Sequence, residues 1–241
     1  MRNLNYQQIT TTIMKKYLSL IAIAVAAWST ANVAAQNAFH PAVDKYGYYN
    51  VLDCPTSPSY FKATTKQNDD GTYNVNIYRA RELSQTISCD VTGGELHFLD
   101  ANFDGNLDIV AGPATARNYT TILLWSDKRG EFVPMDGESL NGYFLVNPKS
   151  KTWVSMSSGG ASIAFYKKMR WNGNALEAAE MLMVFSDPSE LAANGVTTKY
   201  TLIKGDDYYS PASVGCVKKR TNSLKKLPKE WQQIISSFEK M

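Results

Sequence analysis

From residue 60 onward, short runs rich in Tyr, Val, Ile, Thr and Trp alternate with clusters of turn-forming residues. Runs of this kind, bounded by Gly, Pro, Asn or Asp, are typical of β-strands. Asp70-Gly71 and Asn172-Gly173 are the strongest turn signals, because these pairs tolerate the positive φ that a tight hairpin needs. The pattern predicts an all-β fold of antiparallel hairpins, with strands at residues 60–65, 72–79, 120–125, 131–134, 143–146, 152–156, 162–171, 175–185 and 197–204.

The end of the chain has a different period. Its apolar residues recur at spacings of three and four, namely Trp231, Ile234, Ile235 and Phe238, and Pro228 stands where a helix would begin. This predicts one short C-terminal helix whose apolar stripe belongs to the core. No linker and no strict repeat interrupts residues 36–241, so we expect a single domain there.

The first 35 residues have the order of a secretory signal peptide. Lys15 and Lys16 precede an apolar run at residues 17–28, and a polar stretch then ends in the small residues Val33 and Ala35. We expect cleavage after Ala35 and a periplasmic or secreted protein. Met1 and Met14 both remain possible starts. No stretch is apolar and long enough to predict a membrane span.

The net charge of the chain changes once residues 1–35 are removed. The whole chain carries 25 Lys and Arg against 22 Asp and Glu, a net charge of +3. Residues 1–35 contain three of the basic side chains and no acidic one, which leaves 22 of each sign. A neutral domain does not indicate a nucleic-acid partner. The local basic cluster at residues 218–220 and 225–226 is interpreted as a solvated surface.

Export also bears on the three cysteines, Cys54, Cys89 and Cys216, because an oxidising compartment favours disulfides. We expect one disulfide and one spare thiol. All three pairings stay open, and Cys54 with Cys89 closes the shortest loop. A metal site made of these cysteines is not indicated, since no two are spaced as C-x-x-C.

One motif carries sharper chemistry. Residues 100–108 follow the pattern D-x-N-x-D-G-x-x-D, which places oxygen ligands where Ca²⁺ prefers them. Gly105 permits the bend at the sixth position. The predicted ligands are the side chains of four residues and the backbone carbonyl of Asn106 at the seventh position; the four are Asp100, Asn102, Asp104 and Asp108.

This loop differs from an EF-hand. Position twelve is Ala111 instead of a bidentate Glu, and the flanking residues 95–99 and 107–110 are β-like. The pattern is typical of a calcium loop in a β-hairpin, as in integrin-type propellers. Without the bidentate Glu we expect an affinity of roughly 10⁻⁵ to 10⁻³ M. The alternative is an acidic turn that binds no metal.

Three stretches carry a family resemblance: the loop at residues 100–108, the Ser-Gly segment at 155–162 and the hairpin at 166–176. Together they are similar to a family of exported bacterial proteins related to a periplasmic, calcium-binding immunity protein. That protein neutralises a peptidoglycan hydrolase toxin delivered by a type IV secretion system. The resemblance implies a truncated β-propeller-like fold, bound Ca²⁺, and inhibition of a lysozyme-like enzyme through protein–protein contact.

An inhibitor of a glycan-cleaving enzyme needs hydrogen-bond donors and a ring that replaces a sugar. The candidate contact residues are Ser157, Ser158, Gly159, Gly160 and Tyr166. A β-bulge with structural glycines is the alternative for this segment. The sequence has no G-x-S-x-G, H-E-x-x-H or P-loop motif, so we predict no enzyme and no catalytic residues. A glycan- or protein-binding module without inhibitory activity stays open, and a glycoside hydrolase is the third choice.

Overall fold

The structure, a computed structural model, describes residues 41–56, 61–79, 81–89, 95–112, 119–137, 140–160, 162–186, 198–205 and 217–241. These residues belong to one unit, His40–Met241. The predicted signal peptide at 1–35 lies outside the described residues. Among the described residues, no helix is long and apolar enough to cross a membrane.

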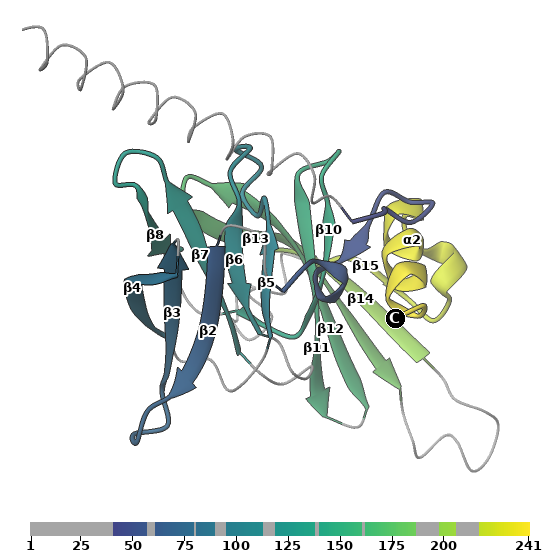
Figure 1. Cartoon of the computed structure of the whole chain (residues 1–241). Coiled ribbons are helices and arrows are strands. Elements are labelled where there is room, and N and C mark those ends of the chain that lie inside the picture. The colour runs from purple at the N-terminus through teal and green to yellow at the C-terminus, as the bar shows by residue number, and fades with distance from the viewer. Residues whose placement is uncertain are drawn as a thin grey trace, which may run out of the picture. The chain divides into compact units, whose positions relative to one another are not determined.

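Three antiparallel sheets make up the described part of the fold (Figure 1). The first has seven strands in the order β1 (Tyr49–Asn50), β10 (Tyr143–Asn147), β11 (Thr152–Gly160), β12 (Ile163–Asn172), β13 (Ala175–Ser186), β14 (Thr198–Lys204) and β15 (Val217–Thr221). The second consists of β2 (Phe61–Gln67), β3 (Tyr73–Arg79) and β4 (Glu82–Cys89). The third consists of β5 (Leu96–Leu99), β6 (Asp108–Ala111), β7 (Tyr119–Ser126) and β8 (Glu131–Pro134), with β9 (Leu140–Asn141) beside β7.

The predicted all-β class is confirmed, and so are the turns on which it rests. Asp70-Gly71 joins β2 to β3, and Asn172-Gly173 joins β12 to β13. Gly71 has φ +87° and Gly173 has φ +59°, the left-handed values that made glycine diagnostic. The propeller-like arrangement of the sheets stays a prediction.

A shared core joins the five-stranded sheet to one end of the seven-stranded sheet. Trp153 of β11 and Met169 of β12 pack there with Leu99 of β5 and Ile122 of β7, and all four are buried. A second core lies under the three-stranded sheet, where Val75 and Ile77 of β3 pack against Phe98 and Leu123. In strand β3, alternate residues therefore fill the core, as the two-residue period predicts.

The C-terminal helix α2 (Lys229–Phe238) begins one residue after Pro228, which is its N-cap. Its predicted stripe is buried and packs on the opposite face of the seven-stranded sheet, against residues such as Leu182 and Leu202. Short 3-10 turns at Val51–Asp53 and Leu224–Lys226 complete the described elements. The interpretation of the stripe as core is confirmed.

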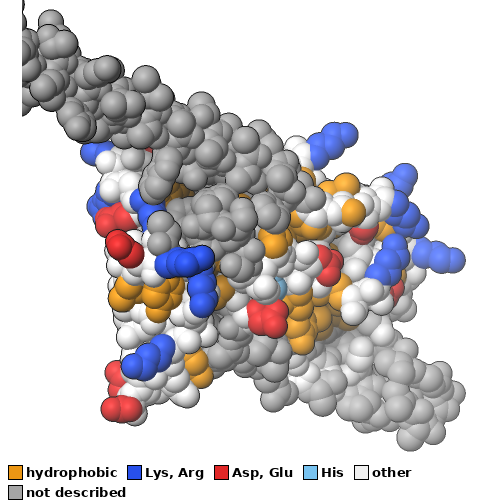
Figure 2. Space-filling view, viewed as in Figure 1, with side chains coloured by type: hydrophobic (Ala, Val, Ile, Leu, Met, Phe, Trp, Pro, Cys, Tyr) orange, Lys and Arg blue, Asp and Glu red, His pale blue; other side chains and the backbone are white. Residues whose placement is uncertain are grey.

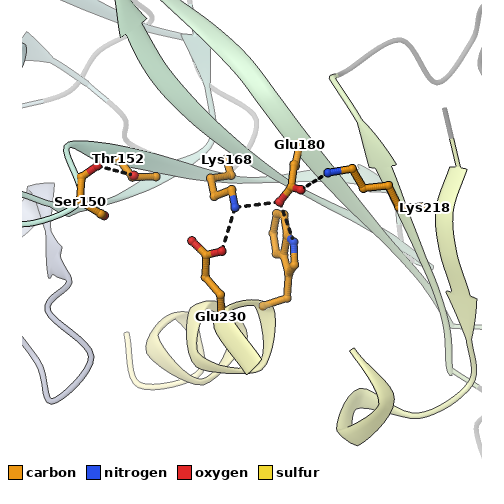
Figure 3. A network of polar contacts seen from close by, with 7 residues as sticks. Ser150, Thr152, Lys168, Glu180, Lys218 and Glu230 are labelled. Atoms are coloured by element: carbon orange, nitrogen blue, oxygen red, sulfur yellow. Dashed lines mark hydrogen bonds and ion pairs between the residues drawn. The ribbon is translucent and has the colours of Figure 1, made fainter. Parts of the chain in front are cut away.

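A polar network also connects α2 to the sheet (Figure 3). Nζ of Lys168 on β12 lies 2.7 Å from Oε2 of Glu180 on β13 and 2.9 Å from Oε2 of Glu230 on α2. Glu180 also pairs with Lys218 of β15, and it accepts a hydrogen bond from the Trp231 indole at 3.2 Å. Only 8% of the Lys168 side chain is exposed, so carboxylates compensate a charge that water does not solvate.

Cys54 and Cys89 are both buried and are not joined to each other. They lie in different cores, Cys54 beside Tyr49 and Val51, and Cys89 beside Val75. Burial raises the pKa of the Cys54 thiol to about 12, which keeps it protonated and unreactive. The shortest-loop disulfide is therefore not formed, and Cys216 lies outside the described residues.

Candidate functional site

The predicted calcium loop connects two adjacent, fully buried strands, β5 and β6, which pair from Leu99–Asp108 to Leu96–Ala111. Between them the chain must reverse within eight residues. Gly105 makes this possible with φ +91°, and no described atom lies within 4 Å of where its Cβ would stand. The predicted role of Gly105 in bending the loop is confirmed.

Phe103 also has a left-handed backbone, with φ +64°. For a bulky residue this conformation is unfavourable, and such positions gather at functional sites where the surroundings hold them in place. The ring of Phe103 packs against the core shared by the two larger sheets. This packing explains how a strained residue persists between Asn102 and Asp104.

Hydrogen bonds within the loop hold its carboxylates. Asp100 accepts from the backbone N–H groups of Asp104 and Gly105, each at 3.0 Å. Asp104 accepts from the Asn106 N–H at 2.7 Å and from the Asn102 side-chain amide at 2.9 Å. Each of these carboxylate oxygens keeps further lone pairs, and oxygen atoms of this kind are the ligands that a hard cation prefers.

Asp108 is the buried member of the set, with no exposed surface. Its Oδ2 accepts from the Ala101 N–H at 2.8 Å and its Oδ1 from the Trp125 N–H at 2.7 Å. Burial raises the pKa of Asp108 well above the ordinary value, although these hydrogen bonds oppose the shift. Burial also raises the pKa of Asp100, and the nearby charge of Asp104 adds to that rise.

The loop is anchored by contacts that the sequence did not predict. The carbonyl oxygen of Ala101 accepts hydrogen bonds from the indoles of Trp153, at 2.8 Å, and Trp171, at 2.7 Å. Since Asp108 holds the N–H of the same residue, Ala101 is fixed on both sides and is fully buried. The only signal in the sequence was the presence of two Trp in β-like runs, which does not reveal a shared acceptor.

The four predicted side-chain ligands thus lie on one short loop. Among the described residues, no group of three or more His, Cys, Asp or Glu side chains is close enough to hold a metal ion. The structure arranges the carboxylates around loop N–H groups, and their convergence on one ion stays a prediction.

A polar recess of about 360 Å³ borders the loop. Asn102 and Asp104 line it from the loop side, and Asp136, Asn174 and Arg129 line it from elsewhere. In this recess, two predicted ligands lie beside one positively charged side chain, Arg129, and one acidic side chain, Asp136. It is therefore suited to polar ligands rather than to apolar ones.

The predicted contact segment lies at the far end of β11. Gly160 has φ +132°, and the pairing of β11 with β12 shifts register between Ser158 and Gly160, which is the β-bulge given as the alternative. The Ser158 hydroxyl donates to the Gly160 carbonyl oxygen at 3.1 Å. A Cβ at Gly159 would overlap the ring of Phe165, so this glycine has a packing reason of its own.

Tyr166 is separated from that segment. Its ring stacks edge-on against Phe238 of α2, with centroids 5.5 Å apart, and it packs into the core under the helix. Its cross-strand partner is Met156 rather than a residue of 157–160. The structure brings Ser157, Ser158, Gly159 and Gly160 together, while Tyr166 faces α2.

Two described features remain, a buried histidine and the basic residues near the C-terminus. His97 is 1% exposed, and its Nδ1 lies 3.1 Å from the Cys54 carbonyl oxygen. The basic residues of 218–220 and 225–226 are exposed. Figure 2 shows Lys and Arg side chains gathered on the side where Figure 1 places α2.

No known family model matches the chain, and no curated protein matches its sequence. Among solved structures, a Xanthomonas type IV secretion system related protein is similar, with a TM-score of 0.43 and 13% identity. The match covers 75% of this chain and 96% of that chain. At this level of similarity, the likeness carries no functional argument.

Proposed function

We propose that this chain is an exported calcium-binding β protein, periplasmic or secreted, that acts by binding another protein and has no catalytic activity of its own. The proposed target is a lysozyme-like peptidoglycan hydrolase, as the sequence resemblance implies. The observation that carries the proposal is the anchored acidic loop. Its three carboxylates lie on nine residues whose ends are fixed by Asp108 and by the Ala101 backbone.

Calcium would supply the missing counter-charge. Burial and mutual repulsion raise the pKa of Asp100 and Asp108, which means that their negative charges are costly as they stand. The proposed ligands are the side chains of Asp100, Asn102, Asp104 and Asp108 with the carbonyl of Asn106. A divalent cation there would offset the repulsion and hold the loop rigid.

Strand β11 connects the proposed calcium loop to the proposed contact segment at residues 157–160. Trp153, near its start, donates to the loop at Ala101, and residues 157–160 form its other end. Gly159 is exposed and its neighbours are half-buried, so hydroxyl and backbone donors of this end are accessible. We propose that a target's acidic cleft binds there.

The calcium step is tested by thermal unfolding of EDTA-stripped protein. We expect millimolar Ca²⁺ to raise the melting temperature, with a half-maximal effect at roughly 10⁻⁵ to 10⁻³ M. Asp104→Ala should abolish this rise. Asp69→Ala, which removes an exposed carboxylate in the β2–β3 turn, is the matched control and should keep it. An unchanged melting temperature in the wild type would refute calcium binding.

The target is tested separately with labelled peptidoglycan. The protein alone should release no fragments, and added lysozyme should be slowed in its presence. Ser158→Arg, which adds bulk at the end of β11, should relieve the inhibition without changing the calcium response. Degradation by the protein alone would instead support an enzyme, and undisturbed lysozyme would remove this hydrolase as the target.

A further inference from the structure

A groove of about 720 Å³ lies on the seven-stranded sheet, away from the acidic loop. Residues of four consecutive strands, β12 to β15, line it. Its volume falls within the range of pockets that hold small molecules, roughly 300–1,000 Å³. The groove thus has room for a ligand that the proposed calcium site does not use.

Strand register explains the make-up of this groove. Phe185 pairs with Ile163 on one side and with Lys199 on the other, and residues paired across a sheet share a face. The next row on the same face runs Phe165, Met183, Thr201 and Arg220. Both rows begin with apolar side chains on β12 and β13 and end with a cation on β14 or β15.

The apolar half of the groove has no core to pack into among the described residues. Ile163, Phe165, Met183 and Phe185 belong to none of the three apolar cores, and all four are only partly buried. Nearer the Asn172-Gly173 turn, by contrast, β12 and β13 contribute Met169 and Ala178 to the shared core. The long strands therefore carry an apolar surface past the end of that core.

The cationic half is also without a partner in the described part of the chain. Lys199 and Arg220 are exposed, and no carboxylate of the described residues forms an ion pair with either. Lys218, on the same strand as Arg220, is by comparison paired with Glu180. The two unpaired cations leave a positive rim beside an apolar floor.

We propose that this groove binds a single-chain amphiphile with an anionic head, of the fatty-acid type. The acyl chain lies over the four apolar side chains and the carboxylate meets Lys199 and Arg220. Charge complementarity selects the head group, and burial of the tail supplies the affinity. The inference goes beyond the proposed function and does not depend on calcium.

The direction of the groove favours an acyl chain over a peptide. Neighbouring strands lie about 4.8 Å apart, so the path from β12 to β15 is about 14 Å long and runs across the strands. A peptide laid along this path would press its backbone N–H and C=O groups against Phe165 and Met183, which offer them no hydrogen bonds. An acyl chain has no such groups to satisfy.

The test is calorimetric titration of the purified full chain with dodecanoate below its micelle concentration. We expect saturable one-to-one binding that is at least tenfold tighter than that of dodecyltrimethylammonium, which has the same tail and the opposite charge. Decanoate, shorter by two CH₂ groups, should bind roughly tenfold more weakly. Equal binding of both head groups, or no binding of dodecanoate, would overturn the proposal.

Three variants locate the site. Lys199→Ala and Arg220→Ala should each weaken dodecanoate about fivefold or more, and the double variant should remove the preference for a negative head. Lys219→Ala is the matched control, because Lys219 is exposed on β15 but pairs with Leu202, whose side chain packs under α2. Its affinity should stay within twofold of the wild type. Equal losses in Lys219→Ala and Arg220→Ala would show non-specific charge attraction instead.

Met183→Glu tests the apolar floor and should weaken dodecanoate more than tenfold, with an unfolding transition like that of the wild type as the check on folding. If that variant is unstable, Met183→Ser replaces it with the same expectation. An extended peptide that alternates Glu and Phe forms the last arm. If this peptide binds and dodecanoate does not, the groove holds a protein segment and the proposal fails.

Discussion

Oδ1 of Asp108 accepts a hydrogen bond from the backbone N–H of Trp125 at 2.7 Å, and this contact joins the acidic loop to strand β7. Its Oδ2 accepts from the Ala101 N–H at 2.8 Å. Asp108 has no exposed surface, so these two N–H groups depend on its carboxylate and not on water as their acceptor. Asp108 therefore holds the loop against strand β7 and is also a proposed calcium ligand.

We predict that Asp108→Ala lowers the free energy of unfolding by about 2–4 kcal/mol even without calcium, because each buried N–H left unpaired costs about 1–3 kcal/mol. Urea unfolding in EDTA measures the change. Asp69→Ala, on an exposed turn, should stay within about 0.5 kcal/mol of the wild type. Equal stability of the two variants would show that Asp108 matters only through a metal.

How far the sequence predicts this fold depends on where each strand buries its side chains. The hairpins around Gly71 and Gly173 were predictable because turn chemistry and alternation agree there. Strand β4 was missed because its residues 82–86 are mostly exposed and polar, and only Ile87 and Cys89 point inward. Strand β15 was missed because Lys218, Lys219 and Arg220 resemble a charged loop, although charged residues are common on edge strands.

The candidate site also has a part that local sequence predicts and a part that depends on tertiary packing. Local spacing was enough to predict the loop and the bend at Gly105. The anchors were beyond prediction, since Trp153 and Trp171 are 52 and 70 residues from Ala101 and meet it only after the sheets have packed. The position of Tyr166 was beyond prediction for a related reason. Its alternation places it on a sheet face, but sequence does not tell which face α2 covers.

A second carboxylate ties the ends of the described chain together. Ser237 on α2 donates its hydroxyl to Oδ2 of Asp44 at 2.6 Å, and Oδ1 of Asp44 accepts from the N–H groups of Tyr46 and Tyr48. Burial alone would raise the pKa of Asp44, but these hydrogen bonds outweigh it and lower the pKa below its ordinary value of 3.8. The contact therefore stabilises the fold more when Asp44 is ionised than when it is protonated.

This shift predicts a dependence on pH. Because the folded-state pKa is the lower one, the contribution of Asp44 is complete above its ordinary pKa and is lost as pH falls through the folded value. The stability gap between the wild type and Asp44→Asn should therefore be widest near neutral pH and should narrow between about pH 5 and pH 2. Urea unfolding at a series of pH values measures the gap. A gap that stays constant would exclude titration of Asp44 as its cause.

The network under α2 predicts unequal effects of its two ends. Lys168→Ala should cost about 2 kcal/mol or more, because it removes the cation shared by Glu180 and Glu230, although Lys218 still pairs with Glu180. The Glu230 side chain is 48% exposed, so Glu230→Ala should cost no more than about 1 kcal/mol. Urea unfolding of both variants, followed by circular dichroism, measures the two losses. Similar losses of unfolding free energy in both variants would contradict the prediction that burial makes Lys168 the more important residue.

Gly142 lies between β9 and β10 with φ +101°, and a Cβ there would clash with the backbone carbonyl of Met156 on β11. Gly142→Ala should therefore cost about 2–5 kcal/mol, from left-handed strain together with forced separation of the strands. Gly71→Ala is the matched control. Gly71 has a similar φ of +87° but no described atom within 4 Å, so strain alone should cost about 1–2 kcal/mol. Chemical unfolding of both variants isolates the clash, because the strain is common to them. If Gly142→Ala were no less stable than Gly71→Ala, the close approach of Gly142 to β11 would not constrain the fold.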